Sequence, residues 1–102
     1  MIRVVAIVTT KPGMRPELLA AFHDAQPAVL QEPGCKEYQA TIDLEGAGPA
    51  QTPFGPDTIA IIETWETMAD LSAHFVGDAL KAYAKRTREL VASRAVHILT
   101  VA

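Results

Sequence analysis

Three predicted strands of this chain carry apolar side chains on both of their faces. In residues 57–65, for example, Ile59 and Ile61 alternate with Ala60 and Ile62. Because successive side chains of a strand point to opposite faces of its sheet, neither face of this strand is polar. A sheet built from such strands must be covered on both sides. The strands that share this property are predicted at residues 2–10, 57–65 and 94–101.

The order of the predicted elements indicates the fold class. A helix follows the first strand, two strands and further helical segments come next, and a strand ends the chain. This βαββαβ order is typical of the ferredoxin-like α+β fold with an antiparallel sheet. The predicted elements are a strand at 2–10, a helix that begins near Pro16 and is ended by Pro33-Gly34, strands at Cys35–Leu44 and Asp57–Trp65, a helix capped by Thr67, a helix that carries Leu80 to Val91, and a strand at Arg94–Val101.

Two segments of this pattern depart from regular elements. Pro27 lies inside the first predicted helix, where it lacks a donor for the helical hydrogen bonds, so we expect it to kink or divide that helix. Residues 45–56 are rich in Gly, Pro and Ala, which predicts a long hairpin connection. Connections of this length in a small domain are often functional.

The second apolar face of the sheet predicts self-association. The helical segments can cover only one face of a four-stranded sheet, so the other face must meet a second copy, another chain or a ligand. A two-fold interface is the commonest solution, because it needs only one self-complementary patch. We therefore predict a homodimer in which residues 1–102 form a single domain.

Composition excludes several classes of protein. The formal net charge is −3, whereas a nucleic-acid-binding domain would be basic. No apolar run reaches the roughly 20 residues that a membrane helix needs, so we expect no membrane partner. The single cysteine, Cys35, cannot form an internal disulfide and fits a reducing, cytoplasmic setting. No two histidines stand four residues apart, and the sequence predicts no metal site.

Several runs lie at the junctions between the predicted strands and helices. They are Pro27-Ala28-Val29-Leu30-Gln31-Glu32-Pro33-Gly34-Cys35-Lys36-Glu37-Tyr38, Pro56-Asp57-Thr58-Ile59, Ile62-Glu63-Thr64-Trp65-Glu66-Thr67, Leu71-Ser72-Ala73-His74 and Leu80-Lys81-Ala82-Tyr83. With the βαββαβ order, these runs resemble the antibiotic biosynthesis monooxygenase superfamily, and within it the bacterial quinol monooxygenase branch. The resemblance covers nearly the whole chain.

The resemblance implies a dimeric α/β barrel with a pocket between the sheet and the helices of each protomer. It also implies oxygenation of a small aromatic substrate by O2, without flavin, haem, metal or any other cofactor. In that chemistry an electron-rich substrate loses a proton and passes an electron to O2, and the radicals recombine in the pocket. The protein would orient the substrate, stabilise its anion and exclude water.

The chain departs from the pattern of the superfamily at two places. Members of the quinol branch often carry a second histidine just before the segment that starts at Leu80, where this chain has Asp78-Ala79. This departure speaks against a mechanism with two histidines. Haem-degrading relatives use an asparagine in the first strand, and the matching residue here is Ala6, which argues against haem degradation.

The predicted catalytic residues are His74, Trp65 and Glu63. As a neutral imidazole, His74 would accept a phenolic proton near neutral pH, although a helix histidine is more often a hydrogen-bonded surface residue. Trp65 is either a wall of the pocket or a core side chain. Glu63 lies within an apolar strand, and a half-buried carboxylate needs a partner or a raised pKa. It either pairs with an arginine across the sheet or faces the pocket as a base.

A further set of aromatic and apolar residues is predicted to bind the substrate. Tyr38 and Tyr83 would offer hydroxyl groups to a quinone oxygen, although Tyr83 is also explained by helix packing. Phe54, in the long connection, is either a lid over the pocket or an anchor of the loop. The predicted substrate-binding residues are Tyr38, Phe54, Tyr83, Phe22 and Met68.

Three hypotheses follow for the function. The first is a cofactor-independent monooxygenase that oxidises a small aromatic quinol or polyphenol with O2. The second is a dimeric binding or stress-responsive module without turnover, and the third is an isomerase or haem enzyme on the same fold. An open pocket of a few hundred Å³ lined by Trp65 would favour the monooxygenase, whereas a pocket filled by side chains would favour the binding module.

Overall fold

Four strands and three helices make up the fold, and the computed structural model describes all 102 residues. The elements are β1 (Ile2–Thr10), α1 (Arg15–Leu30), β2 (Cys35–Thr41), β3 (Thr58–Trp65), α2 (Met68–Phe75), α3 (Asp78–Thr87) and β4 (Val91–Leu99). The strands form one antiparallel sheet in the order β2-β3-β1-β4. This arrangement confirms the predicted ferredoxin-like α+β fold.

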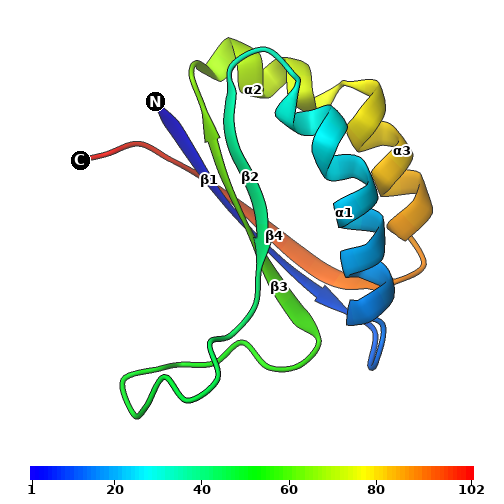
Figure 1. Ribbon diagram of the computed structural model, residues 1–102, viewed down its shortest axis with the longest axis vertical. Coiled ribbons are helices and arrows are strands. Elements are labelled where there is room, and N and C mark those ends of the chain that lie inside the picture. Colours follow the sequence, from blue (N-terminus) through cyan, green and yellow to red (C-terminus); the bar gives the residue numbers. More distant parts are fainter.

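All three helices pack on one side of the sheet (Figure 1). The side chains of β1 and β3 that point toward the helices are fully or almost fully buried, as at Val4, Ile59 and Trp65. Helix α1 contributes Leu18, Phe22 and Val29 to the same core. The core therefore lies between the helices and one face of the sheet, with β1 and β3 at the centre of the sheet.

Helix α1 starts one residue before the predicted position and runs without interruption to Leu30. Pro16 occupies its first turn, where a missing N–H is tolerated. The prediction that Pro27 divides the helix is wrong. The carbonyl that Pro27 leaves without a helical partner belongs to the exposed residue His23, so water can take the place of the lost donor.

Strands β2 and β4 differ most from their predicted bounds, whereas β3 begins only one residue later than predicted. Strand β2 ends at Thr41 instead of Leu44, and the chain then runs as an irregular connection as far as β3. Strand β4 begins at Val91, which the helical spacing had assigned to α3. The helix ends because the N–H of Leu90 turns back to the carbonyl of Thr87, at 2.9 Å. Val91, four positions after Thr87, fits both the helical and the strand spacing of apolar residues. The turn at Leu90 decides that it belongs to the strand.

The face of the sheet away from the helices is open in the single chain (Figure 1). Val5, Ile7 and Ile62 lie on this face and are only partly buried, and Leu99 is 48 % exposed. The apolar character predicted for both faces is therefore present. None of the helices is both long and apolar enough to cross a membrane.

Candidate functional site

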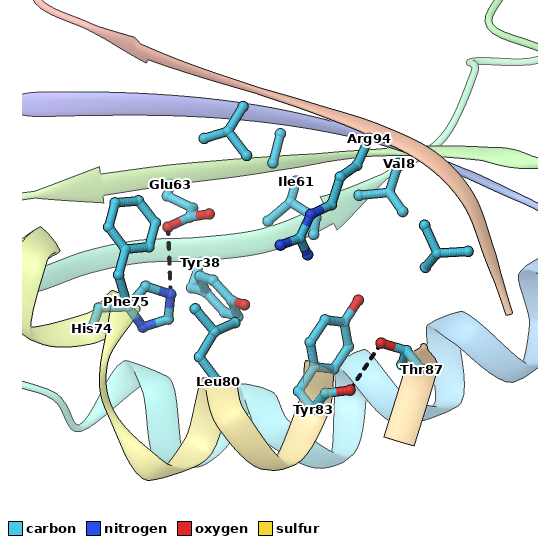
Figure 2. A pocket seen from close by; sticks show the side chains of 13 residues that line it. Val8, Tyr38, Ile61, Glu63, His74, Phe75, Leu80, Tyr83, Thr87 and Arg94 are labelled. Carbon is cyan, nitrogen blue, oxygen red and sulfur yellow. Dashed lines mark hydrogen bonds and ion pairs between the residues drawn. The ribbon is translucent and has the colours of Figure 1, made fainter. Parts of the chain in front are cut away.

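A cavity of about 90 Å³ lies between the helix-covered face of the sheet and helices α2 and α3 (Figure 2). This volume holds several water molecules but is smaller than the few hundred Å³ that we expect of a monooxygenase pocket. Most of its wall is apolar, and the charged or strongly polar groups are few. The lining residues are Ala6, Val8, Tyr38, Ile61, Glu63, His74, Phe75, Leu80, Tyr83, Thr87, Val91, Arg94 and Val96. Such a composition is typical of a site for a small, largely apolar ligand.

The sheet places Glu63 and Tyr38 side by side on the cavity wall. Tyr38 of β2 is directly opposite Glu63 of β3 in the antiparallel register. Directly opposite residues share a face of the sheet and have neighbouring side chains. Both residues are buried, with 2 % of Tyr38 and 5 % of Glu63 exposed.

Helix α2 places His74 against this pair. Thr67 caps the helix, since its Oγ1 accepts the backbone N–H of Asp70 at 3.1 Å, as the sequence predicted. His74 then lies in the last turn, where its ring is 3 % exposed. Its centroid is 4.7 Å from that of Trp65 and 5.5 Å from that of Tyr38. His74 is therefore a buried residue of the site and not a surface histidine.

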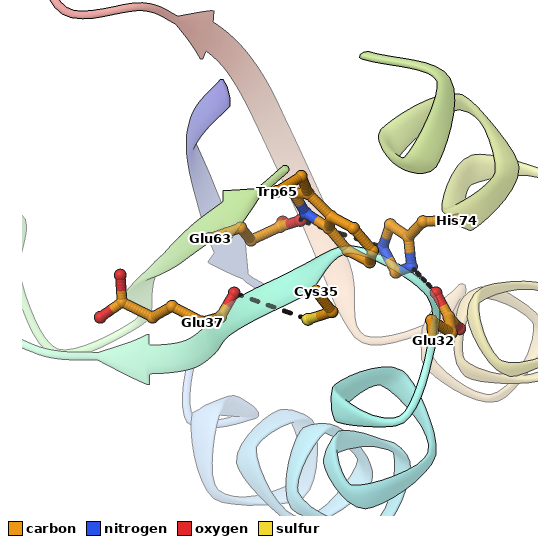
Figure 3. A network of polar contacts seen from close by, with 6 residues as sticks. All are labelled: Glu32, Cys35, Glu37, Glu63, Trp65 and His74. Carbon is orange, nitrogen blue, oxygen red and sulfur yellow. Dashed lines mark hydrogen bonds and ion pairs between the residues drawn. The ribbon is translucent and has the colours of Figure 1, made fainter. Parts of the chain in front are cut away.

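A chain of polar contacts runs through the aromatic cluster (Figure 3). The Nδ1 atom of His74 is 2.8 Å from Oε1 of Glu32, which follows the end of α1. On the other side of the ring, Nε2 is 4.0 Å from Oε1 of Glu63. That oxygen in turn accepts the indole N–H of Trp65 at 2.9 Å. The imidazole therefore lies between two carboxyl groups and makes a hydrogen bond with only one of them.

The contact with Glu32 decides which nitrogen of the neutral imidazole is free. A carboxylate only accepts hydrogen bonds, so Nδ1 carries the proton when Glu32 is ionised. The Nε2 atom then has a free lone pair on the side of Glu63. A carboxylate that fixes the tautomer and orientation of a histidine in this way is a common support for a general base. A hydroxyl group lying against both Nε2 and Glu63 would meet two proton acceptors.

Burial changes the acidity of several groups in the site. Desolvation raises the pKa of Glu63, while the hydrogen bond from Trp65 and the proximity of His74 oppose that rise. Desolvation also raises the pKa of Tyr38, and the nearby Glu63 carboxyl adds to this shift. Both tyrosines of the cavity therefore keep their phenolic protons at neutral pH. A carboxyl group with a raised pKa is closer to the pH at which a general base works best.

The structure brings together four of the eight predicted site residues. His74, Glu63, Tyr38 and Tyr83 all line the cavity. The prediction that Glu63 pairs with an arginine across the sheet is wrong, because its partners are Trp65 and His74.

Two more of the eight lie directly behind the cavity wall. Trp65 is fully buried and does not line the cavity, so its interpretation as a core side chain is the correct one. Phe22 stacks on Tyr38 from within the core, with centroids 4.8 Å apart.

The remaining two predicted residues are not at the cavity. Phe54 is 52 % exposed in the long connection, and Met68 is 44 % exposed at the start of α2. Neither residue lines the cavity. Phe54 is held by its backbone, since its N–H donates to Asp43 at 3.0 Å, which agrees with an anchored loop.

Sequence reasoning missed two charged residues of the site. Glu32 contacts His74 from a position 42 residues earlier in the chain, at the turn after α1. Arg94 reaches the cavity from β4. No local pattern marks either residue, because each meets the site only through tertiary packing. No group of three or more His, Cys, Asp or Glu side chains is arranged to hold a metal ion.

Comparison with known proteins decides the family. Residues 1–86 match the family model described as antibiotic biosynthesis monooxygenase. The chain belongs to this family. It is also 36 % identical over 101 residues to the "Probable quinol monooxygenase YgiN" of Escherichia coli K12, covering 97 % of this chain and 96 % of the relative. The family and this relative together support the assignment as a monooxygenase.

Solved structures agree with the fold. The "Putative antibiotic biosynthesis monooxygenase from Nitrosomonas europaea" superposes with a TM-score of 0.84 at 15 % identity, covering 99 % of this chain and 98 % of the other. Protein SO0527 from Shewanella oneidensis superposes with a TM-score of 0.79 at 25 % identity, covering 96 % of this chain and 87 % of the other. The antibiotic biosynthesis monooxygenase fold thus extends over nearly the entire chain.

Proposed function

We propose that this monooxygenase oxidises a small aromatic quinol or polyphenol with O2 and without a cofactor. The observation that carries the proposal is the pair of proton acceptors, Nε2 of His74 and the carboxyl group of Glu63, which face one apolar cavity walled by tyrosines. A phenolic hydroxyl placed there would lose its proton to this pair. The relative named as a quinol monooxygenase supports the same substrate class.

The reaction needs no electrons from outside the substrate. A quinol gives up two electrons when it becomes a quinone, and insertion of oxygen into one ring C–H bond gives up two more. These four electrons reduce O2, so that one oxygen atom enters the ring and the other leaves as water. The role of the protein is to remove the phenolic proton, hold the anion and keep bulk water out.

The chain lacks the second histidine of the quinol branch, so the proposal assigns proton removal to groups that line the cavity. Ala79, which takes the place of the second histidine, does not line the cavity. It lies instead beside a separate surface hollow that also touches Glu32 and His74. Proton removal in the proposed reaction therefore rests on His74 with Glu63, and Glu32 orients the ring.

Oxygen uptake tests the proposal directly. Metal-free and flavin-free protein should consume O2 with a hydroquinone faster than the hydroquinone autoxidises. His74→Gln and Glu63→Gln should each lower this excess rate by about 100-fold, as is typical when a general base is removed. His23→Gln is the matched control, because His23 is exposed and does not line the cavity. Equal rates in all three variants would refute the assignment of the base.

We also propose that two copies pack through the open face of the sheet to form a dimeric α/β barrel. The partly exposed side chains of Val5, Ile7 and Ile62 form an apolar surface that a second copy would cover. Analytical ultracentrifugation should show a dimer that Ile7→Asp converts to a monomer. A protein that is monomeric without any substitution would refute this proposal.

The free Cys35 fits a cytoplasmic location, where thiols stay reduced.

A further inference from the structure

The cavity has two chemically different ends. Glu63 and His74 lie at one end, and Tyr83 lies toward the other (Figure 2). The side chain of Arg94 reaches into the space above the two tyrosines, Tyr38 and Tyr83. The proposed removal of a proton uses only the first end, which leaves the polar groups of the second end without a role.

The hydroxyl group of Tyr83 is buried without a hydrogen-bond partner. The residue is 8 % exposed, and its Oη is the only buried side-chain polar atom of the chain that lacks a partner. The neighbouring Thr87 does not provide one, because its Oγ1 donates to the backbone carbonyl of Tyr83 at 2.8 Å. Buried polar atoms are nearly always paired, so an unpaired one that faces a cavity indicates a ligand atom. Burial raises the pKa of Tyr83 to about 12, which keeps its O–H a donor.

Arg94 provides a positive charge at the same end. It stands opposite Val8 in the register of β1 and β4, on the helix-covered side of the sheet. It makes no ion pair or side-chain hydrogen bond. Arg88 also has none, but it does not line the cavity, whereas Arg3, Arg15 and Arg86 each have a protein partner. Arg94 is exposed in the single chain, but it lines the cavity, and a guanidinium group there without a protein partner is suited to bind an oxyanion.

We propose that Tyr83 Oη and the Arg94 guanidinium form an oxyanion-binding site, so that the cavity prefers an aromatic ring that carries an ionised oxygen. This inference rests on the proposed function and specifies the form of its substrate. A quinol mono-anion would place its phenolate against Arg94 and Tyr83. Its remaining hydroxyl would then lie toward His74 and Glu63. The carboxyl groups of Glu32 and Glu63 would repel the phenolate from the first end and so favour this orientation.

A redox-stable ligand tests the inference without turnover. At pH 8, 4-nitrophenol is largely a phenolate, and 4-nitroanisole is a neutral ring of similar size. Equilibrium dialysis should show that the unchanged protein binds the phenolate about tenfold or more tightly than the anisole, as expected for charge-assisted hydrogen bonds. The absorbance of the phenolate band in titrations should also show that the apparent pKa of bound 4-nitrophenol is lowered.

Variants assign this preference to the two residues. Arg94→Gln should weaken phenolate binding by about tenfold and should change anisole binding by less than about twofold. Tyr83→Phe should also weaken phenolate binding selectively, and Arg94→Lys should restore part of it. Arg88→Gln is the matched control, because it removes one exposed positive charge that does not line the cavity. Thermal unfolding of each variant reports whether the fold is retained.

The possible outcomes separate this inference from the proposed function. Selective loss of phenolate binding in Arg94→Gln supports the oxyanion site even if no hydroquinone is oxidised, in which case only the proposed function fails. Equal losses for both ligands, an unchanged preference in Arg94→Gln, or no preference in the unchanged protein would each overturn the oxyanion site. Oxygen uptake by the same variants then shows whether Arg94 also acts in turnover.

Discussion

The buried carboxyl group of Glu63 should make the stability of the protein fall as the pH rises. Burial raises its pKa in the folded state above that of the unfolded chain, which is about 4.3. Below that pH the group is protonated in both states, and it does not oppose folding. Above that pH the unfolded chain ionises first, so stability is lost progressively until the pH exceeds the raised folded value.

The substitution Glu63→Gln isolates this effect. Glutamine is neutral at every pH, and its Oε1 can still accept the indole N–H of Trp65, which is 2.9 Å from Oε1 of Glu63. The variant should therefore be about as stable as the unchanged protein at pH 4 and more stable at pH 8. Each pH unit by which the folded pKa is raised adds about 1.4 kcal/mol to this difference. For a domain of this size, each 1 kcal/mol corresponds to about 4–8 °C in Tm.

Urea unfolding followed by the fluorescence of Trp65 measures the difference. Trp65 is the single tryptophan and is fully buried, so its emission reports on the core. Measurements at several pH values from 4 to 8 should use one protein concentration, because association alters apparent stability. Ile59→Val, in the same strand, changes no ionisable group and should cost about 0.5–1.5 kcal/mol at every pH. A Glu63→Gln difference that is equally flat with pH would refute the argument from burial.

Three further predictions concern the segments that hold the site in place. Gly34 and Gly13 have similar φ values, +77° and +79°, but a Cβ at Gly34 would overlap the side chain of Asp70, whereas the space at Gly13 is open. Gly34→Ala should therefore lower Tm by more than Gly13→Ala. Equal losses of Tm would show that the overlap with Asp70 does not destabilise the variant. Thr67→Ala should cost about 1 kcal/mol in urea unfolding, because it removes the cap of α2, and an unchanged midpoint would contradict this role. Cys35 should react with iodoacetamide more slowly than free cysteine at pH 8, because burial and then Glu32 raise its pKa, and a rate equal to that of free cysteine would contradict this shift.

The fold could be predicted because its signals are local. The apolar run from Ile59 to Ile62 is a property of successive residues, and it marks β3 without reference to the rest of the chain. The ends of elements were less predictable, as Val91 shows. Its position fits both a helix and a strand, and the turn at Leu90 that decides between them is a backbone contact with no signal in the pattern.

The site could be predicted only where the alternation of side chains along a strand (strand parity) or the spacing of residues along a helix places a residue. Parity places Glu63 on the face of β3 that is buried, and helix spacing places His74 near the apolar stripe of α2. The contact between His74 and Glu32 depends on how α1 ends relative to α2, which no local pattern records. The same limit explains Phe54, because no local pattern records the path of the long connection, which keeps this exposed residue out of the cavity lining.

The cluster of Glu32, His74 and Glu63 is difficult to explain by stability alone. An apolar side chain in place of Glu63 would avoid the desolvation that raises its pKa, and Trp65 could not form its hydrogen bond in that case. Structural ion pairs usually match a positive group to a negative one, but here two carboxyl groups share one imidazole. This excess of acceptors is useful if a ligand brings the missing proton. A phenolic hydroxyl in the cavity would supply it, so the imbalance of the cluster supports the proposal that the site accepts a proton from a ligand.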